Sequence, residues 1–417
     1  MHVVLAAMAI GTAVSFFLWA LDAVTVLRWA NPWLLWLLPI AGLGSGLLYA
    51  RYGGEANRGT AVLLDEIAEP ADGVPRRMAP MVLAGTLLTH LFGGSAGREG
   101  TAVQMGGSIA AAVERGLSHR LPALFGLTSD ERALLLQAGM AAGFGAVFGT
   151  PITGALFALE VSGRARRSLA ALIACTIAAF VGDAMTGLWG AHHTIYDRIG
   201  LVASGVGPID PGMLMRVAIA AVGFGLASLL FVRATQAMHR LFDRLVRQPW
   251  LRPAVGGAVV VVLALLVGST SYLGLGVRSP DPADVTILSS FAAEGAEPWS
   301  WALKLLFTAV TLGAGFKGGE VTPLFFIGAT LGNTLALLMG APVALFAAIG
   351  FVAVFAGATR TPLACTVMGL ELFGTEPAVY LALACIVAVL CAGRRGIYHP
   401  APGARARKPA HPPAEDL

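Results

Sequence analysis

Long apolar runs, separated by short polar segments, occupy most of the chain. These runs lie near residues 3–27, 33–50, 79–92, 132–160, 168–189, 213–232, 254–275, 300–313, 324–357 and 377–391. A membrane-spanning helix needs about 20 apolar residues, and the runs range from shorter to much longer than this length. They lack the regular alternation of a membrane β-barrel. The pattern therefore predicts an all-α polytopic membrane protein with tilted and broken helices.

Polar segments and the two ends of the chain separate these runs. The polar breaks fall at Arg51–Arg77, Ser118–Glu131, His192–Pro211, Arg233–Pro253 and Ser279–Pro298. No Lys, Arg, Asp or Glu occurs before Asp22, so the basic region of a signal peptide is missing and we expect the first run to remain as a membrane span. Residues 399–417 are rich in proline, alanine and charge, which predicts a disordered cytoplasmic tail.

The second half of the chain repeats part of the first. Gly139–Glu160 aligns with Gly350–Glu371 without a gap, and both segments keep a Thr-Pro step and a final Leu-Glu. A second alignment places Gly97 on Gly319 and Gly106 on Gly328. The two alignments predict two homologous halves, which we place at residues 1–205 and 206–398.

Charge indicates how these halves are oriented. Three arginines follow Glu160 closely, whereas no basic residue follows Glu371 before Arg394. By the positive-inside rule, these two equivalent helix ends should lie on opposite faces of the membrane. The sequence thus predicts inverted-topology repeats, a pattern typical of secondary transporters with a site at the repeat interface.

Each half contains a glycine-rich break that leads into an apolar helix. The breaks are residues 93–106 and 313–323, and Pro323 suits the first turn of the second helix, where no amide proton is needed. Free backbone N–H groups and the positive end of a helix dipole favour anions. We therefore expect both helix N-termini to point inward and to bind an anion together.

A glutamate lies in each break, Glu99 in the first and Glu320 in the second. A carboxylate at bilayer depth costs about 2.5–3.5 kcal/mol on insertion scales and suggests a functional role, here proton exchange. The alternative is that both glutamates simply cap the first turn of a helix, where acids are favoured. Their matching positions in two halves favour the functional interpretation.

Composition narrows the class of protein further. The chain is 56% hydrophobic and 12% charged, with 52 glycines among 417 residues, which excludes an ordinary cytosolic enzyme and fits closely packed membrane helices. A net charge of +4 is too small on so apolar a chain to suggest nucleic acid as a partner. The four cysteines lie singly in or beside apolar runs, and no metal or nucleotide motif occurs, so we expect neither metal nor cofactor.

Other polar residues have less specific interpretations. Residues 93–97 match the G-x-S-x-G nucleophile elbow with His90 nearby, but an elbow needs a strand entering a helix, so we expect no enzyme. Glu160 and Glu371 are expected to be structural residues at helix ends. His192 and His193 are expected to face solvent on the outer side without an acidic partner.

The two glycine-rich breaks resemble those of the CLC family of chloride channels and anion/proton exchangers. The run at 93–106 resembles the family signature GKEGP or GREGP, and residues 318–323 sit where the family has GGxFxP. The resemblance covers about residues 1–400 and implies a homodimer in which each protomer has its own ion path. It also implies that Glu99 is the gating glutamate, which enters the anion path when ionised and leaves it when protonated.

Several positions depart from the chloride-selective members of that family. The loop near residues 55–61 lacks their ion-binding serine and its proline, Thr101 replaces the proline after the gate, and Val161 replaces an internal proton-accepting glutamate. The combination GREGTAVQMG with GGEVTP instead resembles the fluoride/proton antiporter branch. That resemblance implies that Glu320 is the internal proton glutamate and that Thr322 faces the ion.

Together these features predict a multi-pass protein of the plasma membrane that exports fluoride from the cytoplasm in exchange for protons. The predicted ion-binding residues are Gly97, Arg98, Gly100, Val321, Thr322 and Tyr398. Tyr398 alone would be an aromatic residue of the membrane interface, but the resemblance implies that its hydroxyl reaches the inner end of the ion site. A chloride/proton antiporter and a passive anion channel remain as alternatives.

Overall fold

The computed structural model is built from α-helices and short 3-10 turns. It describes residues 1–71, 73–120, 126–163, 168–196 and 210–398, and within these ranges the only β-type pairing is an isolated antiparallel bridge between Gly97 and Gly319. Six helical segments in the described chain are long and apolar enough to cross a membrane. The predicted boundary near residue 205 and the predicted tail at 399–417 lie outside the described residues.

The first half of the chain forms eight of the described α-helices. They are α1 (His2–Ala30), α2 (Leu38–Tyr52), α3 (Thr60–Ala68), α4 (Met78–Leu91), α5 (Glu99–Arg120), α7 (Ser129–Phe148), α8 (Pro151–Val161) and α9 (Leu169–Leu188). A 3-10 turn at Pro32–Leu37 joins α1 to α2, and another at Gly54–Arg58 joins α2 to α3.

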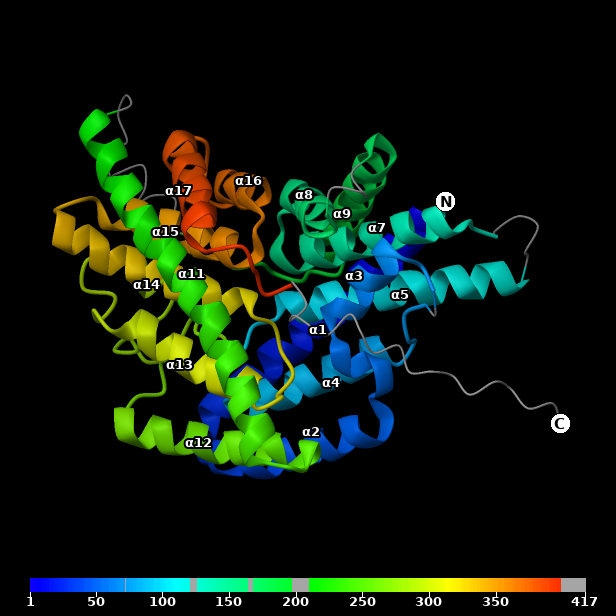
Figure 1. Cartoon of the computed structure of the whole chain (residues 1–417), viewed down its shortest axis with the longest axis horizontal. Helices are drawn as coiled ribbons and strands as arrows, with labels where there is room; N and C mark the ends of the chain where they lie inside the picture. Colours follow the sequence, from blue (N-terminus) through cyan, green and yellow to red (C-terminus); the bar gives the residue numbers. More distant parts are fainter. Residues whose placement is uncertain (72, 121–125, 164–167, 197–209, 399–417) are drawn as a thin grey trace.

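The second half repeats this order of helices without a counterpart of α3. Its helices are α11 (Pro211–Leu245), α12 (Arg252–Val267), α13 (Ser300–Gly313), α14 (Val321–Met339), α15 (Val343–Thr359), α16 (Pro362–Phe373) and α17 (Ala378–Cys391). The two halves lie side by side (Figure 1). α5 packs on α7 as α14 packs on α15, while α2 contacts α12 and α8 contacts α16 across the two halves. The fold is thus an all-α membrane fold of two inverted repeats.

Long apolar runs break into helices where the backbone turns left-handed. The run at 132–160 is two helices, α7 and α8, because Gly149 has φ +72° and Pro151 begins the next helix. The equivalent cap in the second half is Arg360, with φ +65°, followed by Pro362. A side chain is rarely found in this conformation, so the shared cap confirms the repeat at backbone level.

The predicted polar break at Arg233–Pro253 is wrong for its first part. α11 continues without interruption to Leu245. The segment is rich in Arg, Ala, Leu, Met and Gln, which favour helix even where they are not apolar, so its polarity marks the end of the apolar run but not the end of the helix.

Paired glycines bring the helices of each half into close contact. A Cβ on Gly106 would overlap the carbonyl of Gly139, and a Cβ on Gly350 would overlap the carbonyl of Gly328. Small residues allow membrane helices to approach at the backbone. The same pair of contacts, α5 with α7 and α14 with α15, thus recurs in both halves.

Glu160 and Glu371 connect the halves reciprocally. The Glu371 carboxylate accepts hydrogen bonds from the Ile152 and Thr153 amides at the start of α8, at 3.0 and 2.8 Å. Glu160 accepts from the amides of Leu363 and Ala364 at the start of α16, at 3.3 and 2.7 Å. Glu371, at the end of α16, thus caps α8, and Glu160, at the end of α8, caps α16. Both contacts agree with a structural role.

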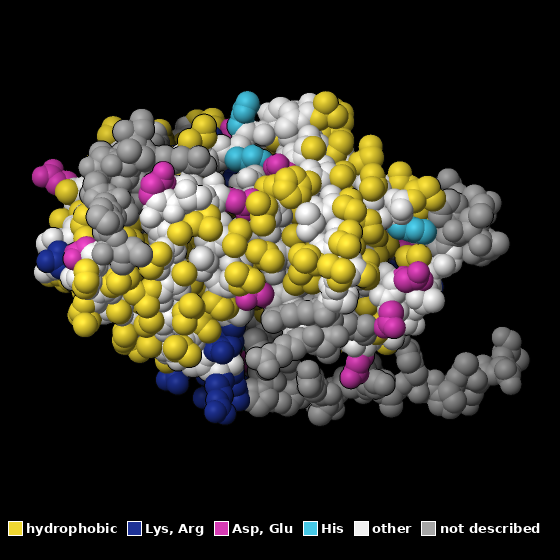
Figure 2. Space-filling view, turned by 90° about the horizontal axis from the view of Figure 1, so that it is seen from above, with side chains coloured by type: hydrophobic (Ala, Val, Ile, Leu, Met, Phe, Trp, Pro, Cys, Tyr) yellow, Lys and Arg dark blue, Asp and Glu magenta, His cyan; other side chains and the backbone are white. Residues whose placement is uncertain are grey.

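The molecular surface is strongly apolar. Figure 2 views the molecule from above Figure 1, where α8, α9, α16 and α17 lie, and hydrophobic side chains cover much of this face. Exposed members on α9 and α17 are Leu169, Leu172, Ile173, Ile177, Phe180, Leu188, Val379, Ile386 and Leu390. Such a surface fits lipid or another protein rather than water.

Candidate functional site

The two glycine-rich breaks meet at the centre of the molecule. The Gly97 amide donates to the Gly319 carbonyl at 2.6 Å, and the Gly319 amide donates to the Gly97 carbonyl at 2.7 Å. A Cβ on Gly97 would lie 2.9 Å from both the amide and the hydroxyl of Thr322. Only glycine allows this approach, which brings the N-termini of α5 and α14 together as the sequence predicts.

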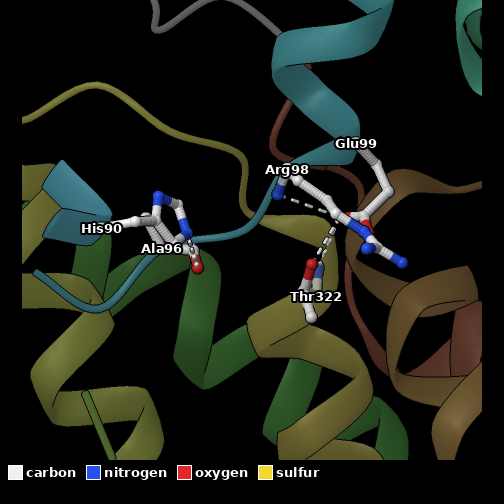
Figure 3. Close-up of polar contacts among 5 residues, drawn as sticks. All are labelled: His90, Ala96, Arg98, Glu99 and Thr322. Atoms are coloured by element: carbon white, nitrogen blue, oxygen red, sulfur yellow. Dashed lines mark hydrogen bonds and ion pairs between the residues drawn. The ribbon is translucent and has the colours of Figure 1, made fainter. Parts of the chain in front are cut away.

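Glu99 reaches across this junction to the start of α14. Its buried carboxylate accepts hydrogen bonds from the Thr322 hydroxyl at 2.6 Å and the Thr322 amide at 3.1 Å, and from the Arg98 Nε at 3.3 Å (Figure 3). These donors are the kind that would bind an anion at a helix N-terminus. The carboxylate therefore occupies a place suited to a small anion.

Glu320 lies beside this junction, but its side chain faces a separate cavity. It occupies the N-cap position of α14 but makes no capping hydrogen bond with its side chain, so the interpretation of Glu320 as a mere helix cap is not supported. Its side chain lines a cavity of about 160 Å³. The cavity, here called the Glu320 cavity, is also lined by Tyr49, Gly59, Gln104, Phe316 and Lys317.

A second, larger cavity of about 500 Å³ approaches the junction through Arg98. We call it the Arg98 vestibule, and its lining includes Arg28, His90, Arg98, His192, His193 and Asp284. It shares no lining residue with the Glu320 cavity. Two separate cavities thus reach the paired glycine loops, one at the residue before Glu99 and the other at Glu320.

The remaining predicted residues take different positions around the junction. Gly100 approaches Gly319 closely, since its Cβ would lie 3.1 Å from the Gly319 Cα. Val321 is buried in the first turn of α14. The Tyr398 ring packs edge-on against Phe157 with centroids 5.9 Å apart, and its hydroxyl makes no hydrogen bond within the described chain. The junction therefore brings together Gly97, Arg98, Glu99, Gly100 and Thr322.

An interleaved cluster of aromatic rings supports α14 and Tyr398. The rings of Phe325 and Phe351 stack with centroids 4.0 Å apart, and Phe355 lies edge-on to Phe325 at 5.1 Å. Phe157 stacks near Phe355 at 5.9 Å. Rigid packing of this kind fixes the first turns of α14 relative to α8 and α15.

The elbow interpretation of Ser95 finds no support in these contacts. The Ser95 hydroxyl lies 2.9 Å from that of Thr308. Both ring nitrogens of His90 instead face backbone carbonyls, that of Thr86 at 2.8 Å and that of Ala96 at 3.1 Å. Figure 3 shows the contact with Ala96. His90 thus braces the first glycine loop and does not activate the serine.

The expectation that His193 lacks an acidic partner is wrong. Its Nε2 lies 3.5 Å from Asp183 on α9, and both His192 and His193 line the Arg98 vestibule. The pairing joins residues ten positions apart across the end of α9, so no local sequence pattern indicated it.

Lys317 is the main site residue that the sequence analysis missed. It lies three residues before Glu320 and lines the same cavity. A basic residue inside an otherwise apolar, glycine-rich break is itself a signal, because intramembrane charges are by default functional.

A model of the voltage-gated chloride channel family matches residues 41–393. The chain belongs to this CLC family. A "Chloride/fluoride channel protein" from Pseudomonas syringae pv. tomato is 46% identical over 401 residues, which are 95% of this chain and 84% of that relative. A "Putative chloride channel protein ClcB-like" from Ralstonia nicotianae is 27% identical over 402 residues, which are 88% of this chain and 84% of that relative.

Solved structures of CLC proteins share the fold. The crystal structure of a CLC-type fluoride/proton antiporter matches with a TM-score of 0.85 at 32% identity, covering 95% of both chains. The structure of a slow cyanobacterial Cl⁻/H⁺ antiporter matches with a TM-score of 0.77 at 19% identity, covering 94% of both chains; at that identity the likeness concerns the fold. Of these two solved structures, the fluoride/proton antiporter has the higher identity and TM-score to this chain.

Proposed function

We propose that this CLC protein exports fluoride from the cytoplasm in exchange for protons. The observation that carries the proposal is the Glu99 carboxylate held by the amide and hydroxyl of Thr322. Protonation of Glu99 would weaken its hold on these donors and free them for an anion. One site would thus serve a proton and an anion in turn, which is the requirement for exchange.

Fluoride suits the donors of this site. It is small and strongly hydrated, so a binding site must replace its water with direct hydrogen bonds. The Thr322 hydroxyl and amide, the Arg98 side chain, a protonated Glu99 and the Tyr398 hydroxyl are donors of this kind. We assign the ion site to Gly97, Arg98, Gly100, Val321, Thr322 and Tyr398.

Exchange also requires a route for the proton beyond Glu99. Glu320 is two residues from Thr322 and faces a cavity distinct from the Arg98 vestibule. Val161 cannot carry a proton, so Glu320 is the carboxylate suited to exchange protons with the inner solution.

The orientation follows from the arginines beside the Glu320 cavity. Gly59 and Ala56 line it, and Arg51, Arg58, Arg76 and Arg77 flank the same loop region. Under the positive-inside rule, this cavity opens to the cytoplasm and the Arg98 vestibule opens outward. We place the protein in the plasma membrane as a homodimer, with residues 399–417 in the cytoplasm.

Transport by purified protein in liposomes tests this function. Fluoride and chloride electrodes should report faster loss of fluoride than chloride from liposomes loaded with both ions. An imposed proton gradient should drive fluoride uphill, with a pH dye reporting the opposite proton movement.

Either of two other results would contradict the proposal and favour one of the alternatives. Equal loss of chloride and fluoride coupled to protons would indicate a chloride/proton antiporter. Purely downhill flux that ignores the pH gradient would indicate a channel, as the name of the Pseudomonas relative suggests for that protein.

A further inference from the structure

Lys317 occupies a niche formed by two helices other than its own. Its ammonium lies 4.3 Å from the ring centroid of Tyr49 on α2. A Cβ on Gly85 of α4 would lie 2.9 Å from the Lys317 Cβ and 3.0 Å from its Cγ. The aromatic face holds the cation, and the missing side chain of Gly85 makes room for the lysine stem. Three separate elements therefore fix the position of this lysine.

The charge of Lys317 has no anionic partner in the described chain. No carboxylate there lies within 4.0 Å of it, and its ammonium makes no hydrogen bond to a described residue. A partly buried cation without such a partner is costly unless water or an anion compensates it. Lys317 lines the Glu320 cavity, whose 160 Å³ is ample for a small ion with some water, since one water needs about 10–15 Å³.

The rest of the cavity suits a small anion next to a carboxyl group. Gln104 brings a side-chain amide from α5, and this amide donates to the Thr60 hydroxyl at 3.2 Å. Glu320 contributes the cavity's carboxylate. The titratable groups facing the cavity are Tyr49 from α2 and Lys317 and Glu320 from the α13–α14 connection.

We infer that the Glu320 cavity is a second anion site, in which Lys317 binds a small monovalent anion. The inference rests on the proposed function for the identity of that anion, fluoride. An ionised Glu320 repels the anion and competes with it for the ammonium, whereas a protonated Glu320 does neither. Anion occupancy and protonation of Glu320 are therefore linked, and each favours the other. The cavity can thus hold a fluoride that enters from the cytoplasm while Glu320 carries a proton that has arrived from the gate, before that proton leaves to the inner solution.

Calorimetry with sodium fluoride tests this inference on the full chain in detergent. The experiment uses the Glu99→Gln background, so that proton uptake at the gate does not contribute. Titration in buffers of different ionisation enthalpy measures how many protons are taken up as fluoride binds. We expect proton uptake in this background, at least tenfold weaker binding with Lys317→Met, and retained binding with Lys317→Arg.

Three further variants complete the experiment. Glu320→Gln should bind fluoride without proton uptake. Arg51→Met is the matched control, because Arg51 is an exposed cation on α2 that lies 5.7 Å from the Tyr52 ring, outside the cavity; it should bind like its parent. If Lys317→Met does not fold, Tyr49→Leu keeps the lysine but removes its aromatic support and should also weaken binding.

Unchanged fluoride binding by a folded Lys317→Met would overturn the inference. Retained binding with lost proton coupling would also overturn it, because Lys317 would then be a proton relay and not an anion ligand. Wild-type liposome exchange is measured separately. If wild type fails to exchange fluoride for protons but calorimetry shows Lys317-dependent anion binding, the proposed function fails and the anion site stands.

Discussion

A single carboxylate and a single threonine define the central contact of this protein. Glu99 belongs to α5, yet its hydrogen bonds satisfy Thr322 at the start of α14. Because an anion and this carboxylate need the same donors, binding of one excludes the other. In the proposed exchange, either the Glu99 carboxylate or the anion accepts the hydrogen bonds of Thr322 at any one time.

Thr322→Val removes the hydroxyl donor and keeps the side-chain shape. The backbone amide at 3.1 Å remains, so we expect fluoride binding to weaken by about tenfold to a hundredfold, in line with a lost hydrogen bond to a charged acceptor of about 1.5–3 kcal/mol. Fluoride titration by calorimetry measures this. Thr322→Ser, which restores the hydroxyl, should recover most of the affinity; equal affinity in Val and wild type would remove Thr322 from the ion site.

Glu99→Gln removes the titratable group of the gate while retaining its size. Proton-coupled turnover should be abolished, because the amide cannot take up and release a proton. The measurement is fluoride-driven proton pumping in liposomes, with fluoride binding checked in parallel to identify folded protein. Persistent proton pumping against a gradient would mean that coupling does not pass through Glu99.

Glu320→Gln should affect proton transport and fluoride binding to different extents. The change relieves the desolvation of a carboxylate at membrane depth, so we expect folded protein that loses proton transport far more than fluoride binding. Parallel fluoride-electrode and pH-dye recordings measure the two losses. Equal loss of both, or of neither, would argue that Glu320 does not carry the proton.

At the scale of helices, glycine pairs determine how closely each half packs. The Gly106–Gly139 and Gly328–Gly350 contacts place backbone against backbone, so a methyl group at any of these positions would overlap the neighbouring helix. These contacts join the helices that carry Glu99 and Thr322 to their neighbours. Helix spacing and the geometry of the site are therefore coupled.

Gly350→Ala should destabilise the protein by about 1–3 kcal/mol through overpacking. Thermal unfolding in detergent, followed by tryptophan fluorescence, should show a lower midpoint. Gly44→Ala on α2 is the matched control, since a Cβ there meets no atom within 4 Å, and it should be neutral or slightly stabilising. A Gly350→Ala midpoint as high as that of Gly44→Ala would show that the helices can separate without loss.

The repeats and the junction were accessible to sequence analysis for a physical reason. Glycine and proline are retained where the backbone requires them, so Gly106, Gly328 and the Thr-Pro steps kept the two halves alignable. Glu99 was identified because it lies within the first glycine-rich break, and Thr322 because the second break resembles the fluoride/proton antiporter branch. Helix ends such as Leu245 were not, because hydropathy reports where the apolar run stops and not where helical hydrogen bonding stops.

The niche of Lys317 shows what the sequence could not give. Tyr49, Gly85 and Lys317 lie far apart in the chain and in no repeating pattern, and their contact exists only after α2, α4 and the second glycine loop have packed. The Asp183–His193 pair was missed in the same way. Contacts between elements that share no periodicity leave no local signal.

At the scale of the whole molecule, every component of the proposed pathway lies within one chain. Residues of this chain line the Arg98 vestibule and the Glu320 cavity and form the glycine junction between them. The apolar face formed by α8, α9, α16 and α17 lies at one end of the molecule (Figure 1), and its exposed side chains on α9 and α17 line neither cavity. A dimer formed through that face would bury apolar surface without altering either cavity.

If each protomer of the proposed homodimer has its own ion path, a quantitative prediction follows. A tandem dimer of one wild-type and one Glu99→Gln protomer should retain about half of the proton-coupled fluoride flux of the wild-type tandem, because each protomer would need only its own Glu99 and Thr322. Liposome flux, normalised to reconstituted protein, measures this, and a tandem with two Glu99→Gln protomers sets the baseline. Flux at that baseline in the mixed tandem would mean that the pathway is shared between protomers. Because this chain supplies Glu99, Thr322 and the lining of both cavities, we expect half.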